Sequence, residues 1–130
     1  MLFAIMDASI DDGAPTPLVI LEWTSRKQRR VCRSSLSSEA QSAAYAVDAL
    51  DFGKRSLSLI IDPTQNMTAS ATAARLGRSP CITDCKALFD AARSASPAGG
   101  STEKRTGIEI QQVAETMKEI GGIWRWTDTH

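Results

Sequence analysis

The stretch "RRVCRSSLSSEAQSAAYAVDAL", from Arg29 to Leu50, decides the fold because a basic segment runs directly into the start of a long helix. Ser34 and Ser35 are residue types that favour the N-cap position of a helix. Small and apolar side chains then recur at helical spacing, at Leu36, Ala40, Ala43, Ala44, Val47 and Leu50. The pattern predicts an amphipathic helix that can be followed to Asp62, although Gly53 disfavours the second half.

Short segments rich in β-forming residues precede this helix. "LFAIMDAS" predicts a strand from Leu2 to about Asp7, and the turn-like segment "DDGAPTP" follows it. "LVILEW" predicts a second strand over Leu18–Trp23. After the basic turn "TSRKQ", the segment "RRVCRS" is a candidate third strand that would pair back across the turn.

The second half of the chain alternates between the two kinds of element. Residues 64–80 are small and polar and predict a variable loop with a weak helix in "ATAARL". A strand is expected to end near Asp84 and to run into a helix that reaches about Ser94, followed by a flexible linker over residues 95–101. The helix that follows carries one apolar face, which consists of Ile110, Val113, Ala114, Met117 and Ile120. With a last strand at "IWRWT", this order predicts an α/β fold with a mixed sheet and helices packed on it.

The bulk composition limits the classes of function. A chain of 130 residues is expected to form a single domain, 1–130. Its 15 basic and 15 acidic residues cancel, so overall charge predicts neither a nucleic-acid nor a membrane partner. Three cysteines and no signal-peptide pattern predict an intracellular protein, cytoplasmic or nuclear.

Three acidic residues are candidate metal ligands because of their positions next to predicted strands and the long helix. Asp7 and Asp84 each end a predicted strand, and Glu39 lies at the edge of the apolar stripe of the long helix. Each also has a simpler interpretation: Asp7 as a turn residue, Asp84 as a helix N-cap, and Glu39 as an acid favoured by the helix dipole. Taken together, they are the hard oxygen ligands that a two-metal Mg²⁺ site requires.

The segment "WTSRKQRRVCRSSLSSEAQSAAYAVDAL" resembles the ribonuclease H domain of copia-type retrotransposon polyproteins. That family has a tryptophan, a basic turn, a short strand and an "R-S-S/T-x-A/S-E-A" opening of its first helix, which match Trp23, Ser25–Lys27, Val31–Arg33 and Ser34–Ala40. "ITDCKALFDAARS" is similar to the family's strand-end aspartate segment, and "STEKRTGIEI" to a later helix start. The resemblance covers roughly residues 18–127.

The resemblance implies a ribonuclease H-like fold and catalysis by a D-E-D-D set of carboxylates that bind Mg²⁺ or Mn²⁺. Glu39 matches the family glutamate and Asp84 the second aspartate. Asp7 either is the first aspartate or lies on what corresponds to the second strand, because only 32 positions separate it from Glu39. The fourth aspartate has no match, since Asp128 does not fit its motif. The domain is therefore expected to be incomplete at its C-terminus, and on one alternative at its N-terminus also.

The implied activity is hydrolysis of the RNA strand of RNA–DNA hybrids, in a chain whose partners include other domains of a polyprotein and no membrane. A cluster of basic residues predicts contacts to the phosphate backbone: Arg26, Lys27, Arg29, Arg30 and Arg33. Its simpler interpretation is a solvated hairpin turn. The alternative function is a degenerate, non-catalytic remnant that folds and at most binds nucleic acid.

Two further features favour structural roles. Cys81 and Cys85 bracket Asp84, but a zinc site would need more ligands than the sequence offers there. Trp124 and Trp126 share one face of the last strand, where core packing is the main expectation and base stacking is the alternative.

Overall fold

The computed structural model describes residues 1–7, 9, 12–25, 27, 31–32, 34–64, 68–94 and 104–128, without the side chain of residue 69. By its internal contacts the chain divides into two compact units, Met1–Arg30 and Val31–His130, and each is described by itself. The single domain over 1–130 stays a prediction.

The first unit contains an antiparallel ribbon of two strands, β1 (Leu2–Met6) and β2 (Leu18–Trp23). Leu2 lies opposite Trp23 and Met6 opposite Leu18. The ribbon is closed at one end by two hydrogen bonds, from the Met1 ammonium group to the Thr24 carbonyl (2.8 Å) and from the Thr24 amide to the Met1 carbonyl (2.9 Å). Both strands were predicted from the sequence and are confirmed.

The predicted third strand is not formed in the described part of its segment. Val31 and Cys32 belong to no strand, whereas Arg29, Arg30 and Arg33 lie outside the described residues. The prediction of one mixed sheet is also wrong for the described chain, which has two separate two-stranded sheets. The broader prediction of a mixed α/β fold with packed helices is confirmed.

The second unit begins with α1 (Ser35–Ile61), a helix of 27 residues. Ser34 is its N-cap, and its hydroxyl oxygen accepts a hydrogen bond from the Ser37 amide at 3.1 Å, as the two serines predicted. The helix continues through Gly53 to Ile61, and Asp62 is its C-cap with extended backbone, because Pro63 disfavours helical backbone in the residue before it. The extended helix is therefore confirmed.

The segment predicted as a variable loop, 64–80, contains regular structure. The helix α2 (Ala69–Leu76) begins after Thr68, whose hydroxyl oxygen accepts from the Ala71 amide at 3.3 Å. Gly77 ends it with a φ of 68°, a left-handed backbone conformation that glycine adopts without steric cost. The loop prediction is wrong here, and the weak helix within it is confirmed. The predicted linker, 95–101, lies outside the described residues.

The second sheet consists of β3 (Ser79–Thr83) and β4 (Gly122–Trp126), which run parallel. Ser79 is paired with Gly122 and Thr83 with Trp126. A parallel pair needs a long crossover connection, and here it contains α3 (Lys86–Arg93) and α4 (Lys104–Glu119).

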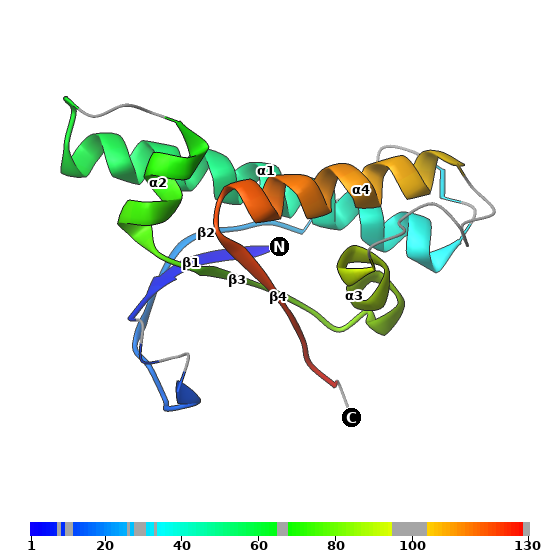
Figure 1. Cartoon of the computed structure of the whole chain (residues 1–130). Coiled ribbons are helices and arrows are strands. Elements are labelled where there is room, and N and C mark those ends of the chain that lie inside the picture. The colour runs from blue at the N-terminus through cyan, green and yellow to red at the C-terminus, as the bar shows by residue number, and fades with distance from the viewer. Residues whose placement is uncertain are drawn as a thin grey trace. The chain divides into compact units, whose positions relative to one another are not determined.

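The core of the second unit lies mainly among three helices. Its buried apolar residues come from α1 (Ala40, Ala43, Val47), from α3 (Leu88, Ala92), and from α4 and the residue after it (Ile110, Val113, Met117, Ile120). In Figure 1, α4 runs alongside α1, and the small side chains of the α1 face allow the larger ones of α4 to approach. The predicted apolar face of α4 is thus confirmed. No helix in the described ranges is long and apolar enough to cross a membrane.

Candidate metal and nucleic-acid site

Glu39 is the fifth residue of α1 and precedes Ala40, which is completely buried in the core. The first turn of α1 contains no acidic residue. Stabilisation of an acid by the helix dipole is strongest within the first turn and falls off beyond it. The dipole therefore explains the position of Glu39 less well than the sequence suggested, and the Ser34 hydroxyl already caps the helix.

Asp84 is exposed and lies between β3 and α3, at the carboxyl end of a strand as predicted. Its interpretation as a helix N-cap is wrong, because the N-cap of α3 is Cys85. The Cys85 amide donates to the Thr83 hydroxyl oxygen at 3.1 Å. The turn into α3 is thus stabilised by Thr83, and the Asp84 carboxylate is not needed for it.

Both carboxylates are available for other chemistry. Among the described residues, the structure records no hydrogen bond or ion pair to the side chain of Glu39 or of Asp84. Glu39 lies in α1, and Asp84 lies directly before the N-cap of α3, a helix that packs against α1 near its N-terminal, cyan end (Figure 1). Carboxylate oxygens are ligands that suit Mg²⁺ and Mn²⁺, so these two residues fit a divalent cation in charge and in type.

Asp7 belongs to the first unit and follows the last residue of β1. One of its carboxylate oxygens accepts a hydrogen bond from the Ser9 amide at 2.9 Å. This bond lowers the pKa of Asp7, because it stabilises the charged form. The geometry is that of a local turn, which agrees with the simpler interpretation, and a shared site with Glu39 and Asp84 stays a prediction.

Within the described residues, no group of three or more His, Cys, Asp or Glu side chains is placed to hold a metal ion. Cys81 and Cys85 are free, half-buried thiols. Burial raises the pKa of Cys81 to about 11.

The basic cluster is described only at Lys27, which is exposed. Its other members lie outside the described residues: Arg26, Arg29, Arg30 and Arg33. An exposed lysine can contact a phosphate as a point charge. The cluster as a whole stays a prediction.

Trp126 is the residue near Asp84 whose position the sequence did not predict. Its indole N–H donates to the backbone carbonyl of Asp84 at 3.3 Å, and its side chain is 41% exposed. The ammonium group of Lys86 lies 5.5 Å from the centre of the Trp126 ring. Core packing was therefore the right expectation for Trp124, which packs against the core, and the wrong one for Trp126.

This arrangement follows from the pairing of the two parallel strands. The Thr127 amide donates to the Thr83 carbonyl at 3.0 Å, so the chain leaves β3 and β4 at the same edge of the sheet. Asp84 and Trp126 meet there although they are 42 positions apart. The sequence signal was the period of two in β4, which places Trp124 and Trp126 on one face but does not say how far the core extends.

No protein-family model, curated protein or solved structure matches this chain.

Proposed function

We propose that the chain is a ribonuclease H-like domain that hydrolyses the RNA strand of RNA–DNA hybrids with two divalent metal ions. The observation that carries the proposal is the position of the Glu39 and Asp84 carboxylates and their lack of recorded partners among the described residues. Asp84 is not the N-cap of α3, and Glu39 lies beyond the first turn of α1, where the helix dipole is weaker. Among the described residues, the structure records no hydrogen bond or ion pair to either carboxylate. A carboxylate kept free beside a packed core is what a metal ligand requires.

The resemblance to copia-type ribonuclease H domains supplies the reaction and the substrate. Glu39 and Asp84 would hold Mg²⁺ or Mn²⁺, and Asp7 is the candidate for a third ligand. When bound, the two ions would supply an activated water and would stabilise the leaving oxygen. The chain itself then needs no nucleophilic side chain. Its tasks are to orient the ions and to hold the hybrid.

Several groups would hold the substrate. Lys27 and the other basic residues of its turn would contact phosphates of the hybrid, with release of counterions. Trp126 fixes the backbone of Asp84 through its indole N–H, which would keep the Asp84 carboxylate in place. The proposed setting is an intracellular polyprotein, in which neighbouring domains present the hybrid.

The second candidate is a remnant of such a domain that folds and at most binds nucleic acid. Two observations favour this second candidate. The Asp7 carboxylate accepts a hydrogen bond from the Ser9 amide within its own turn, and the described residues contain no group of three or more His, Cys, Asp or Glu side chains placed to hold a metal ion. An incomplete ligand set leaves the metal charge and geometry incomplete, so hydrolysis would fail while folding persists.

The test is cleavage of a labelled RNA–DNA hybrid in Mg²⁺ or Mn²⁺ by the parent chain, by Glu39→Gln and by Asp84→Asn. The two substitutions keep shape and remove charge, and each is expected to lower the rate by at least about 100-fold, since even outer-shell changes cost 10–100-fold. Matched controls are Glu119→Gln and Asp90→Asn, two exposed acids elsewhere on α4 and α3, which are expected to cleave like the parent.

A folded parent chain that cleaves nothing would exclude the enzyme and leave the remnant. Binding of the uncleaved hybrid, measured by fluorescence anisotropy, then separates a nucleic-acid-binding remnant from an unrelated α/β interaction domain. If the control variants lost as much cleavage rate as Glu39→Gln and Asp84→Asn, the loss would follow from the changed net charge and not from a lost metal ligand.

A further inference from the structure

The helix α1 has a second apolar face, opposite the one that packs into the core. Phe52 is 74% exposed and Ile60 78% exposed, and Tyr45 and Leu59 are exposed as well. At 3.6 residues per turn, these positions lie on the side of the helix away from Val47. A surface helix normally carries polar side chains there. Large apolar side chains gathered on one exposed face mark an interaction surface.

The spacing along this face is that of a helix–helix seam. Five residues follow one another at intervals of four, three, four and three: Tyr45, Ala49, Phe52, Ser56 and Leu59. We call them the outer seam. The same alternation of spacing defines the a and d positions of a coiled coil, which keep facing a partner helix over several turns. Large and small side chains alternate strictly along it.

We propose that the outer seam binds the outer seam of a second copy of this chain, with the two α1 helices antiparallel. A twofold axis near Leu50 and Asp51 brings each large side chain of one copy onto a small one of the other. Phe52 then packs on Ala49 of the second copy, and Tyr45 on its Ser56. A symmetric dimer requires this kind of self-complementary surface.

The charges beside the seam fit the same arrangement. Asp48 is exposed and Arg55 lies seven positions further on, so both flank the outer seam on one side. In the antiparallel dimer, Asp48 of each copy faces Arg55 of the other, which forms the ion pair twice. In a parallel dimer, Asp48 would face Gly53 of the other copy, which is uncharged, so no ion pair would form there. Arg55 also holds Asp51 within its own helix, through an Nε–Oδ1 distance of 2.8 Å.

This inference is independent of the proposed function, because the outer seam includes neither Glu39 nor Asp84. The test is sedimentation equilibrium of the full chain over roughly 1–500 µM, a range suited to small interfaces that associate weakly. The parent is expected to dimerise. Phe52→Lys is expected to raise the dissociation constant at least about ten-fold, because a central aromatic side chain dominates such interfaces. The matched control is Ile108→Lys, on an equally apolar but isolated residue of α4 that is 58% exposed, and it should dimerise like the parent.

Two charge variants test the orientation. Asp48→Lys and Arg55→Glu each place like charges opposite one another at two positions of the homodimer, and each should dimerise about two- to thirty-fold more weakly, because exposed ion pairs are individually weak. An equal mixture of the two restores both ion pairs and should recover the parent affinity. Circular dichroism checks that each variant keeps its helices.

A parent chain that is monomeric at every concentration overturns the proposal. So does a dimer that Phe52→Lys leaves intact. A monomer in which Phe52→Lys lowers the free energy of unfolding would show that this face is covered from within the same chain. A dimer whose charge variants do not recover on mixing overturns the antiparallel arrangement.

Discussion

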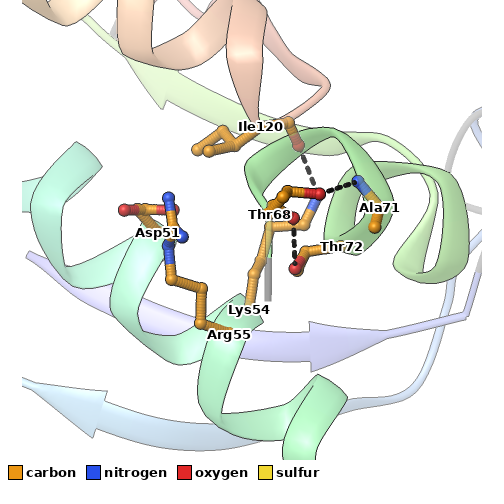
Figure 2. Close-up of polar contacts among 7 residues, drawn as sticks. All are labelled: Asp51, Lys54, Arg55, Thr68, Ala71, Thr72 and Ile120. Atoms are coloured by element: carbon orange, nitrogen blue, oxygen red, sulfur yellow. Dashed lines mark hydrogen bonds and ion pairs between the residues drawn. The ribbon is translucent and has the colours of Figure 1, made fainter. Parts of the chain in front are cut away.

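The ammonium group of Lys54 donates a hydrogen bond to the backbone carbonyl of Ile120 at 2.6 Å, across 66 positions of the chain (Figure 2). It also donates to the Gly77 carbonyl at 2.9 Å, and the residue is only 4% exposed. Gly77 follows α2 and Ile120 follows α4, so one buried lysine of α1 satisfies carbonyls at the C-terminal ends of two other helices. A cation is favourable at both ends, where the helix dipoles are negative.

Replacing this lysine should cost stability. Lys54→Met keeps the apolar stem and removes the donors, which leaves two carbonyls unsatisfied, and we expect the free energy of unfolding to fall by about 1–3 kcal/mol. Urea denaturation followed by circular dichroism measures the change. Lys86→Met is the control, since Lys86 is exposed and its pair with Asp90 should contribute less than about 1 kcal/mol. If Lys54→Met were as stable as the parent, the cost of burying the ammonium group would offset its hydrogen bonds.

The thiol of Cys81 should make stability fall at alkaline pH. Burial raises its pKa from 9.0 to about 11, so between these values the folded chain keeps a proton that the unfolded chain releases. The contribution of the protonated thiol is complete below pH 9 and is lost as the pH rises through 11, by up to about 2–3 kcal/mol. The measurement is the difference in unfolding free energy between the parent and Cys81→Ala from pH 8 to 11. A difference that does not change with pH would contradict the buried, protonated thiol.

Metal binding at Asp84 should be visible in the fluorescence of Trp126. The indole N–H donates to the Asp84 carbonyl, so a paramagnetic Mn²⁺ ion held by the Asp84 carboxylate would lie close to the ring and quench it. We expect saturable quenching by Mn²⁺ that is lost in Asp84→Asn and in Trp126→Phe. Asp90→Asn, in the same helix–strand region, should be quenched like the parent. Unchanged quenching in Asp84→Asn would place the metal elsewhere, whatever the hydrolysis assay gives.

Lys27 should contribute to nucleic-acid affinity without sequence preference. Each phosphate contact adds about 0.9 to the slope of log affinity against log salt concentration on a duplex. Lys27→Ala should weaken binding of hybrids of different sequence equally and reduce the slope by about one. Anisotropy titrations between roughly 50 and 200 mM salt measure both. Lys118→Ala, an exposed lysine at the end of α4, is the control and should leave the slope unchanged.

Local sequence patterns located nearly every helix and strand of the described chain. The serines before α1, the period of α4 and the β-rich segments at Leu2–Met6 and Leu18–Trp23 all correspond to observed elements. These patterns act over a few residues, through capping, periodicity and turn chemistry, so they can be read without knowing the fold. The sequence predicted only a weak helix within 64–80, because the residues there are small and polar and the helix is capped by the single hydroxyl of Thr68.

The candidate site was predictable in part. The sequence predicted the position of Glu39 near the start of the long helix and that of Asp84 at the end of a strand. It also offered a simpler interpretation of each acid, the helix dipole for Glu39 and a helix N-cap for Asp84. These interpretations depend on the residue at which each helix begins, which the structure shows: α1 has Ser34 as its N-cap, so Glu39 lies beyond the first turn, and α3 has Cys85 rather than Asp84 as its N-cap.

By itself, the sequence determined the approximate positions of most helices and strands, which helical faces are apolar, and which acids lie beside them, because these properties follow from residues close together in the chain. Only the tertiary structure decided that Lys54 is buried, that Trp126 reaches the Asp84 backbone, and that Phe52 and Ile60 of α1 are exposed. The physical reason is that burial depends on partners far away in sequence. A lysine becomes a core residue only when two distant helix ends offer it carbonyls.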